Sequence, residues 1–384
     1  MDFTLTRPQK EIQKAAREFA KGEFDKETGL DYEKNGIYPK EILKKACELG
    51  FVGIHFPEQY LGSGLGLFEN CLVAEELCSK DSSFGLALTL SGYGSECILR
   101  FGTEAQKKRY LPEIADGELF SAAAFLEPVQ GFDFRKLKTK ALKTNGGWTI
   151  NGEKTLVANA GLADVYVVLC QTGDDSLPPE KRHSMFVVDA ATKGLSFREA
   201  GRRLGCNMLP AADLVFENLR AGEENLIGEE GKGLEYALAY FRELRVLLAA
   251  QAVGIGEGAF KKALGYARER EQFGKKIASF GAISHKLADM ATKIESARTL
   301  VYRAAWSFDN GILDSGLASM AKMVATRAAV DVCYEAIQIH GGYGFMTEYE
   351  VEHFYRDAKF LDLFCGSLPS LKDEIAAGVI GRTR

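Results

Sequence analysis

The chain has 384 residues, of which 46% are apolar and 26% are charged, and its formal net charge is −5. This length and apolar content are enough for one large core or for two to three coupled domains. The slightly acidic balance argues against a nucleic-acid-binding surface, which is normally basic, and no apolar run is long enough to cross a membrane.

The chain start and the cysteines indicate a cytoplasmic protein. The first residues lack the basic and apolar regions of a secretory signal peptide. None of the eight cysteines forms a Cys-x-x-Cys pair, as expected for buried thiols in a reducing compartment. The five histidines are scattered, so we expect no metal site.

Residues 1–118 carry helical patterns. Pro8 opens the first helix, and apolar residues recur at helical spacing from Ile12 to Phe19. A further helix is predicted over residues 72–80, and residues 98–110 lie in another helical region. The glycines at 62, 64 and 66 mark a loop ahead of both.

Residues 119–229 read as a compact β domain. Apolar runs of strand length occur at 120–125, 165–170, 185–188 and 214–216. The turn signals Asn145-Gly146-Gly147 and Asn151-Gly152 predict a short strand over 148–150 between two turns.

Residues 230–384 return to helix, now in long elements. Apolar residues from Ile283 to Val301 recur in alternating steps of four and three, which places an apolar seam along one helix face. A similar seam runs from Leu234 to Leu248. A third helix is predicted over 317–340, ending at Gly341-Gly342.

Two glycine-rich stretches are poor candidates for phosphate loops. Gly254-Ile-Gly256-Glu-Gly258 lies inside a helical pattern and lacks the preceding strand of a dinucleotide fingerprint, so close helix packing is preferred. The glycines at 62–66 are not followed by Lys-Ser/Thr, as a P-loop requires. The residues alone therefore predict only a globular protein in α–β–α order with a helix-bundle surface.

Four separated motifs resemble those of the acyl-CoA dehydrogenase family. They are Phe125-Leu-Glu-Pro-Val-Gln-Gly-Phe-Asp133, Arg270-Glu-Gln-Phe273-Gly274, Gln338-Ile-His-Gly341-Gly342-Tyr-Gly344 and Arg356-Asp-Ala-Lys359. Each motif is weak alone, but their order and spacing in an α–β–α chain make the resemblance specific. It covers about residues 3–380.

The resemblance implies an α+β fold with three domains. They are an N-terminal helical domain (1–118), a central β-barrel-like domain (119–229) and a C-terminal four-helix bundle (230–384). It also implies FAD between the β domain and the bundle, an acyl-CoA substrate and an electron-transferring flavoprotein as redox partner. The expected assembly is a homotetramer or a hetero-oligomer in which a neighbouring subunit completes the flavin site.

Matching positions carry the family's site onto this chain. The residues implied at the flavin ring are Phe125, Glu127, Leu156, Val157 and Ala158, and Ser367 is also implied to bind the cofactor. The residues implied at the pyrophosphate and adenosine are Arg270, Phe273, Gln338, Gly341 and Gly342. Those implied at the substrate are Phe132, Arg245 and Gly366. Arg270 is alternatively a solvated arginine at a helix end, and Gln338 an exposed polar residue.

Cys365 stands where the resemblance implies a catalytic glutamate. The second position that some relatives use for the base, just before Arg245, holds Leu244. The backbone N–H of residue 365 keeps its implied role of polarising the thioester carbonyl, because that role needs no side chain. The thiol is either an unusual base or, as we prefer, a small apolar filler.

Other carboxyl and hydroxyl groups are weaker candidates for the base. Glu243 is one helical step from the second position and is turned by roughly 100°. Glu96 and Tyr93 belong to a helix that the resemblance places along the acyl pocket.

Two hypotheses follow from the residues near the implied flavin. The resemblance predicts small or polar residues where this chain has Leu126, Phe132, Ala158 and Gly281. The first hypothesis is an FAD-dependent oxidoreductase that acts on an acyl-CoA by non-standard chemistry or on an unusual, for example cyclic, acyl group. The alternative is a catalytically silent partner subunit of a hetero-oligomeric acyl-CoA dehydrogenase.

Overall fold

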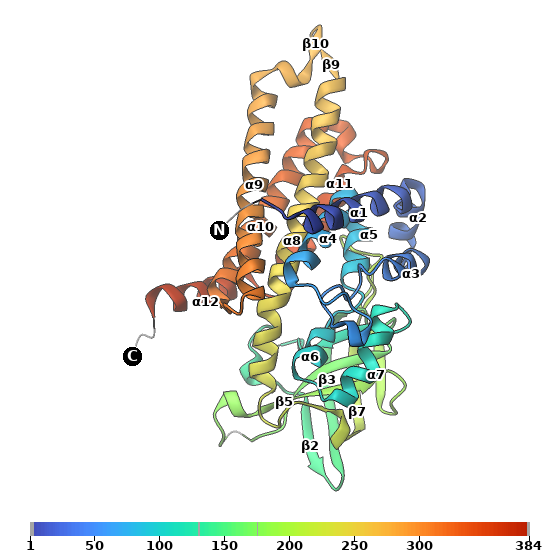
Figure 1. Ribbon diagram of the computed structural model, residues 1–384, viewed down its shortest axis with the longest axis vertical. Helices are drawn as coiled ribbons and strands as arrows, with labels where there is room; N and C mark the ends of the chain where they lie inside the picture. The colour runs from blue at the N-terminus through green and yellow to red at the C-terminus, as the bar shows by residue number, and fades with distance from the viewer. Residues whose placement is uncertain (1–3, 130, 175, 382–384) are drawn as a thin grey trace.

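The protein is described from a computed structural model, which describes residues 4–129, 131–174 and 176–381. A layer of helices comes first, a sheet domain follows, and long helices close the chain (Figure 1). This arrangement confirms the α+β fold with helical N- and C-terminal parts and a central sheet.

The N-terminal part consists of short helices that lie beside the bundle and the sheet (Figure 1). They are α1 (Arg7–Glu23), α2 (Lys26–Asn35), α3 (Lys40–Glu48), α4 (Leu67–Lys80), α5 (Ser82–Thr89), α6 (Ser95–Phe101) and α7 (Glu104–Ala115). The helical region predicted over 98–110 holds parts of two helices, α6 and α7. Gly102 ends α6, and Thr103 starts α7 with a capping box in which Thr103 and Gln106 bond to each other's backbone.

The central part is one twisted sheet with β4 and β5 in its buried middle. Its strands are β1 (Ser121–Ala124), β2 (Lys140–Thr144), β3 (Gly147–Ala158), β4 (Val165–Gln171), β5 (His183–Asp189), β6 (Leu195–Glu199), β7 (Ala211–Gly222) and β8 (Leu226–Ile227). The order along the sheet is β6-β7-β3-β2-β4-β5-β8, with β1 paired in parallel to β4.

The turn predicted at Asn151-Gly152 is also wrong. Strand β3 passes straight through these residues, and its pairing with β7 shifts register between Ile150 and Gly152. Gly152 has a φ of +146°, and a Cβ there would lie 2.5 Å from the backbone of Thr139. The glycine therefore serves a bulge and a close approach of two strands, which gives the same local signal as a turn.

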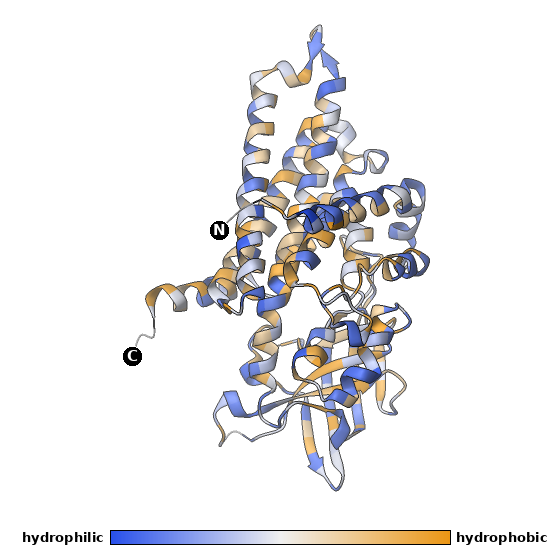
Figure 2. Cartoon of the chain, in the orientation of Figure 1, coloured by the Kyte–Doolittle hydropathy of each residue, from blue (hydrophilic) through white to orange (hydrophobic). Residues whose placement is uncertain are grey.

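The C-terminal part is a bundle of long helices. They are α8 (Gly233–Glu269), α9 (Gly281–Asp309), α10 (Ser315–His340), α11 (Val351–Leu363) and α12 (Leu368–Ile380), with the small hairpin β9 (Glu271–Gln272) and β10 (Lys275–Lys276) between α8 and α9. Figure 2 shows hydrophobic residues on the faces where these helices meet. In the described part of the chain, no helix is both long and apolar enough to span a membrane.

The glycines of α8 serve close packing, as predicted. A Cβ at Gly254 would lie 2.3 Å from the Glu75 carbonyl oxygen, and one at Gly258 would lie 2.4 Å from the Ser79 carbonyl oxygen. Both carbonyls belong to α4. Helices α4 and α8 thus approach too closely for any side chain at these two positions.

Candidate active site

The loop between α11 and α12 is held rigidly by two buried cations. Arg245 Nε donates to the Cys365 carbonyl oxygen at 3.3 Å, and Lys322 Nζ donates to the Gly366 carbonyl oxygen at 3.0 Å. Cys365 lies in the left-handed region at φ 55°. Within the described chain, the Cys365 N–H has no hydrogen-bond acceptor. The loop therefore presents a fixed and unused backbone donor.

The Cys365 side chain is a buried thiol. Only 2% of the residue is exposed, and its Sγ lies 3.7 Å from the Tyr93 hydroxyl oxygen. Burial raises the pKa of Cys365 to about 12, although the Tyr93 hydrogen bond and the charges of Lys322 and Arg245 act in the opposite direction. A thiol with this pKa is protonated near neutral pH, which favours the interpretation as a filler.

The neighbouring carboxylate on α8 is already engaged. Both oxygens of Glu243 accept hydrogen bonds from Arg100, at 2.8 and 3.2 Å. Leu244, one residue later, lines a narrow cavity together with Tyr93 and Tyr240. Leu244 thus lines this cavity, Cys365 contacts the lining residue Tyr93, and Glu243 is held by Arg100.

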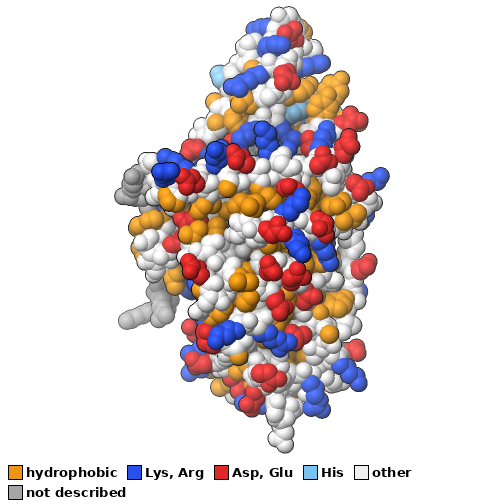
Figure 3. Space-filling model, turned by 45° about the vertical axis from the view of Figure 1, so that its right-hand side comes forward, with side chains coloured by type: hydrophobic (Ala, Val, Ile, Leu, Met, Phe, Trp, Pro, Cys, Tyr) orange, Lys and Arg blue, Asp and Glu red, His pale blue; other side chains and the backbone are white. Residues whose placement is uncertain are grey.

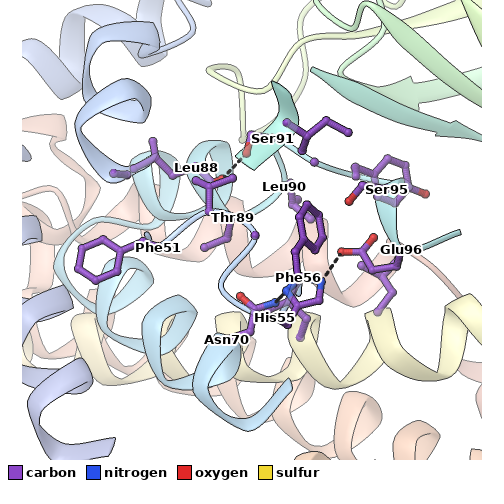
Figure 4. Close-up of a pocket in the computed structure, with 18 of the residues that line it drawn as sticks. Phe51, His55, Phe56, Asn70, Leu88, Thr89, Leu90, Ser91, Ser95 and Glu96 are labelled. Atoms are coloured by element: carbon purple, nitrogen blue, oxygen red, sulfur yellow. Dashed lines mark hydrogen bonds and ion pairs between the residues drawn. The ribbon is translucent and has the colours of Figure 1, made fainter. Parts of the chain in front are cut away.

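This acyl cavity, as we name it, lies between α4, the turn before α6, and α8, and its volume is about 40 Å³ (Figure 4). Phe56, Leu90 and Leu247 form an apolar wall, while His55 and Glu96 bring polar groups. The expectation that Tyr93 belongs to a helix is wrong. Helix α6 begins at Ser95, because Gly94 at φ 98° separates Tyr93 from it.

The residues predicted at the substrate are linked to the loop. Arg245 lies over the Phe241 ring at 5.8 Å, and Phe241 contacts Phe132 edge to face at 6.5 Å. A Cβ on Gly366 would lie 3.4 Å from Arg245 Nη2, and Gly366 has a φ of +133°. Arg245 also donates to Ser319 and Glu374. The structure therefore brings Phe132, Arg245 and Gly366 to one region.

The two segments predicted at the flavin ring also lie side by side. The Thr155 N–H donates to the Leu126 carbonyl oxygen at 3.0 Å, which joins the stretch 125–127 to the stretch 155–158. Phe125, Val157 and Ala158 are buried. Leu156, at φ 49°, is 58% exposed and offers an apolar surface on which a planar ring can rest.

The Glu127 side chain points into the protein. It accepts hydrogen bonds from the Lys138 and Thr139 N–H groups at 2.7 and 2.9 Å, and Lys154 Nζ lies 3.0 Å from it. Burial raises the pKa of Glu127, but the Lys154 charge and these hydrogen bonds outweigh it, so the pKa is lowered. Only the backbone of Glu127 remains free for a cofactor. Gln130 of the same motif lies outside the described residues.

The residues predicted to contact pyrophosphate and adenosine lie at the far end of α8, beside the β9–β10 hairpin. Phe273 at the hairpin tip is 92% exposed. The Arg270 guanidinium lies over the Tyr343 ring at 5.9 Å, and no carboxylate pairs with it in the described part of the chain. A Cβ at Gly341 or Gly342 would meet only open space. Gln338 is exposed one turn earlier on α10.

This surface fits a dinucleotide. An unpaired guanidinium matches pyrophosphate oxygens, glycines without side chains admit a ligand close to the backbone, and exposed rings can stack on a base. The exposed apolar side chain of Leu156 fits the face of the flavin ring. The residues present therefore fit FAD. Among the described residues, no cluster of His, Cys, Asp and Glu could hold a metal ion.

The two halves of the predicted site are far apart in one chain. Arg245 and Arg270 lie on α8 and at its end, and the 25 residues between them correspond to about 38 Å of helix. Figure 1 shows α8 running from the sheet to the hairpin. Ser367, which was predicted to bind the cofactor, has an exposed side chain that caps α12. Its hydroxyl oxygen accepts from the Ser370 N–H at 3.4 Å.

Sequence reasoning missed several residues that shape the site. Lys322 and Lys154 are fully buried, and His55 lines the acyl cavity. A lysine within the apolar pattern of residues 317–330 was the available signal for Lys322. Nothing in the local sequence distinguishes Lys154 or His55 from surface residues.

Family models match nearly the whole chain. The acyl-CoA dehydrogenase N-terminal domain matches residues 6–118, the middle domain residues 122–219 and the C-terminal domain residues 231–380. The chain is similar to an acyl-CoA dehydrogenase of Bacillus subtilis (strain 168), with 39% identity over 366 residues that cover 94% of this chain and 95% of that protein.

Solved structures agree with this match. One, described as the electron transferring flavoprotein of Acidaminococcus fermentans, has 36% identity and a TM-score of 0.95 over 100% of both chains. Another, the FAD complex of PigA, has 28% identity and a TM-score of 0.94, also over 100% of both chains. The fold, the paired segments at the flavin surface and these matches agree. The chain therefore belongs to the acyl-CoA dehydrogenase family of FAD-dependent oxidoreductases.

Proposed function

We propose that this protein is an FAD-dependent oxidoreductase that acts on CH–CH groups of an acyl-CoA without a glutamate base at residue 365 or 244. The observation that carries the proposal is the Cys365 loop. Its backbone donor is unused and fixed, while its side chain is a thiol whose pKa is raised to about 12.

The backbone donor supports the thioester part of the chemistry. A preorganised N–H stabilises negative charge that develops on a carbonyl oxygen, and it does so with any side chain at that position. Arg245 and Lys322 hold the two following carbonyls, so the Cys365 N–H does not need to reorient during the reaction. Bound FAD supplies the two-electron oxidant or reductant.

The side chains support a departure from the usual α,β-dehydrogenation. A general base needs a pKa near the working pH, and Cys365 does not have one. Leu244 has no proton acceptor, and Glu243 is bound by Arg100. We therefore propose that the reaction leaves the α-proton in place, removes hydrogen at another position, or acts on an unusual, for example cyclic, acyl group.

Assembly follows from the separation along α8. Since one chain keeps the substrate-side Arg245 and the hairpin-side Arg270 about 38 Å apart along α8, we propose that the hairpin of one subunit completes the flavin site of another, in a homotetramer or a hetero-oligomer. An electron-transferring flavoprotein is the proposed redox partner, consistent with the relative from Acidaminococcus fermentans. Eight buried and unpaired cysteines favour a reducing, cytoplasmic location.

A silent partner subunit is the competing function. Leu126, Ala158 and Gly281 offer no side-chain hydrogen bonds to a flavin, whereas the hairpin surface with Arg270 and Phe273 is fully formed. This contrast would suit a subunit that helps a neighbour's flavin site and binds none itself.

Purification of the chain alone separates the two functions. An enzyme is expected to be yellow from bound oxidised flavin and to be bleached anaerobically by one member of a panel of straight, branched, cyclic and dicarboxylic acyl-CoAs. A colourless chain that becomes yellow only with a second dehydrogenase-like chain would support the silent partner. A yellow chain that no acyl-CoA binds or bleaches would contradict the proposed substrate.

A further inference from the structure

The acyl cavity has a polar side that the family match does not account for. His55 Nε2 lies 3.4 Å from Glu96 Oε1, and Asn70 Nδ2 lies 3.3 Å from His55 Nδ1. Figure 4 shows the three side chains meeting at one end of the labelled group. They come from three separate segments: the loop before α4, α4 itself and α6.

These polar groups are not satisfied by the protein. His55 Nε2 and the Tyr240 hydroxyl are buried and have no hydrogen-bond partner within the described residues. If the Asn70 amide donates to Nδ1, the His55 proton lies on Nε2 and faces Glu96. A separation of 3.4 Å is longer than a good N–H···O hydrogen bond. Because buried polar groups are nearly always hydrogen-bonded, these atoms indicate a missing partner.

The space and the charge limit what that partner is. A cavity of about 40 Å³ has room for about three waters, or for a few non-hydrogen atoms of a substrate. The apolar lining residues Phe56, Leu90 and Leu247 suit hydrocarbon. The Glu96 carboxylate disfavours a second carboxylate in the same space, since like charges repel strongly where water is excluded.

We propose that the acyl cavity selects a short acyl group that carries a neutral oxygen, either a hydroxyl or a carbonyl. The oxygen accepts from His55 Nε2, and a hydroxyl also donates to Glu96. Tyr240 provides a further hydrogen-bonding group in the same cavity. This inference rests on the proposed function, because it requires the acyl part of the thioester to enter here.

The test is isothermal titration of acyl-CoAs into the flavin-loaded protein, without oxygen or an electron acceptor. Two pairs of ligands differ only by methyl against hydroxyl: isovaleryl-CoA against 3-hydroxybutyryl-CoA, and valeryl-CoA against 4-hydroxybutyryl-CoA. We expect the hydroxyl member of at least one pair to bind about tenfold more tightly, the gain from one hydrogen bond to a charged group. Succinyl-CoA supplies the anionic comparison and is expected to bind more weakly.

Variants assign the preference to the pair. In Glu96→Gln and in His55→Leu/Glu96→Leu we expect the hydroxyl preference to fall to about twofold or less, with the hydrocarbon ligands still bound. Glu235→Gln removes an exposed carboxylate from α8 and is expected to keep the preference. If the double variant does not fold, the test rests on the hydroxyl preference measured in the wild type and in Glu96→Gln.

Three results would overturn the inference. If the hydrocarbon member of each pair binds as tightly as the hydroxyl member or more tightly, the cavity does not select an oxygen. Tightest binding of succinyl-CoA would replace a neutral oxygen by an anion. If the preference for hydroxyl ligands survives in Glu96→Gln and in the double variant, the groups that recognise the hydroxyl lie elsewhere. Failure of every acyl-CoA to bind the flavin-loaded protein would instead reject the proposed function, and this inference with it.

Discussion

At the scale of single residues, buried charges shape the region around the site. Lys322 and Arg245 hold the carbonyls of the Cys365 loop, and Lys154 holds the stretch from Phe125 to Glu127 through hydrogen bonds to both residues. Burial lowers the pKa of Lys322 to about 8. Such groups are costly to bury, so their value lies in fixing the geometry of the backbone that they contact.

The Lys154–Glu127 pair leads to a stability prediction. Lys154→Met leaves the Glu127 carboxylate buried without its cation, and we expect a loss of about 3 to 5 kcal/mol in the free energy of unfolding. Urea denaturation followed by circular dichroism measures it. The matched control is Arg198→Met, which breaks the exposed Arg198–Glu153 pair and should cost about 1 kcal/mol or less. Equal losses in both variants would show that burial of the pair is unimportant.

Sequence reasoning at this scale predicted which residues lie together where the resemblance named them, and missed contacts that only tertiary structure creates. Arg245, Phe132 and Gly366 converge as the resemblance implied. The inward turn of Glu127 depends on Lys154, which lies 27 positions away and has no local signature. The polar side of the acyl cavity likewise joins segments that are far apart in the chain.

At the scale of elements, α8 and its hairpin organise the molecule. Helix α8 reaches from the sheet to the hairpin and packs against α4 through its glycines. Long helices with regular apolar spacing were predictable, as was the end of α10 at Gly341. The division of 98–110 into two helices and the passage of β3 through Asn151-Gly152 were not, because a glycine signals a cap, a bulge and a turn alike.

The hairpin tip gives a prediction about assembly. If Phe273 contacts a neighbouring subunit and its flavin, Phe273→Ala should lower the assembled mass in sedimentation velocity at micromolar concentration and release FAD on gel filtration. Leu142→Ala, which alters another exposed apolar residue, on β2, is the control and should change neither. An unchanged mass with unchanged flavin content in Phe273→Ala would contradict the proposed role of the hairpin.

At the scale of the whole molecule, charge is mixed and thiols are buried throughout. Figure 3 shows acidic and basic side chains interspersed over the visible face, in keeping with a net charge of −5. All eight cysteines are buried and free. Subunit contacts lie beyond what one chain's pattern specifies.

The buried thiols predict a loss of stability at alkaline pH. Burial raises the pKa of every cysteine, to about 12 for Cys47, Cys170 and Cys365. A group whose folded pKa exceeds its unfolded value, about 8.5 for cysteine, stabilises fully below 8.5 and loses that contribution as pH rises toward 12. Each thiol then contributes a loss of up to about 1.4 kcal/mol per pH unit.

The urea midpoint should therefore fall steadily between pH 8.5 and 10.5. The buried Lys322 and Lys154, whose pKa values are lowered by burial, act in the opposite direction, but they are two groups against eight thiols. In Cys47→Ala we expect the urea midpoint to fall less steeply with pH, because one of the eight contributing thiols is removed. A midpoint that stays constant over this range would mean that the thiols are far less buried than the fold indicates.

The central claim is that Cys365 supplies a backbone donor and not a base. The most direct measurement is the anaerobic rate of flavin bleaching by the best acyl-CoA from the panel, compared between the wild type and Cys365→Ala from pH 7 to 10. We predict rates within about threefold of each other and no rise of the rate toward alkaline pH that depends on the thiol. A fall of about 100-fold or more in Cys365→Ala, together with a wild-type rate that climbs with pH, would make the thiol the base and contradict this account.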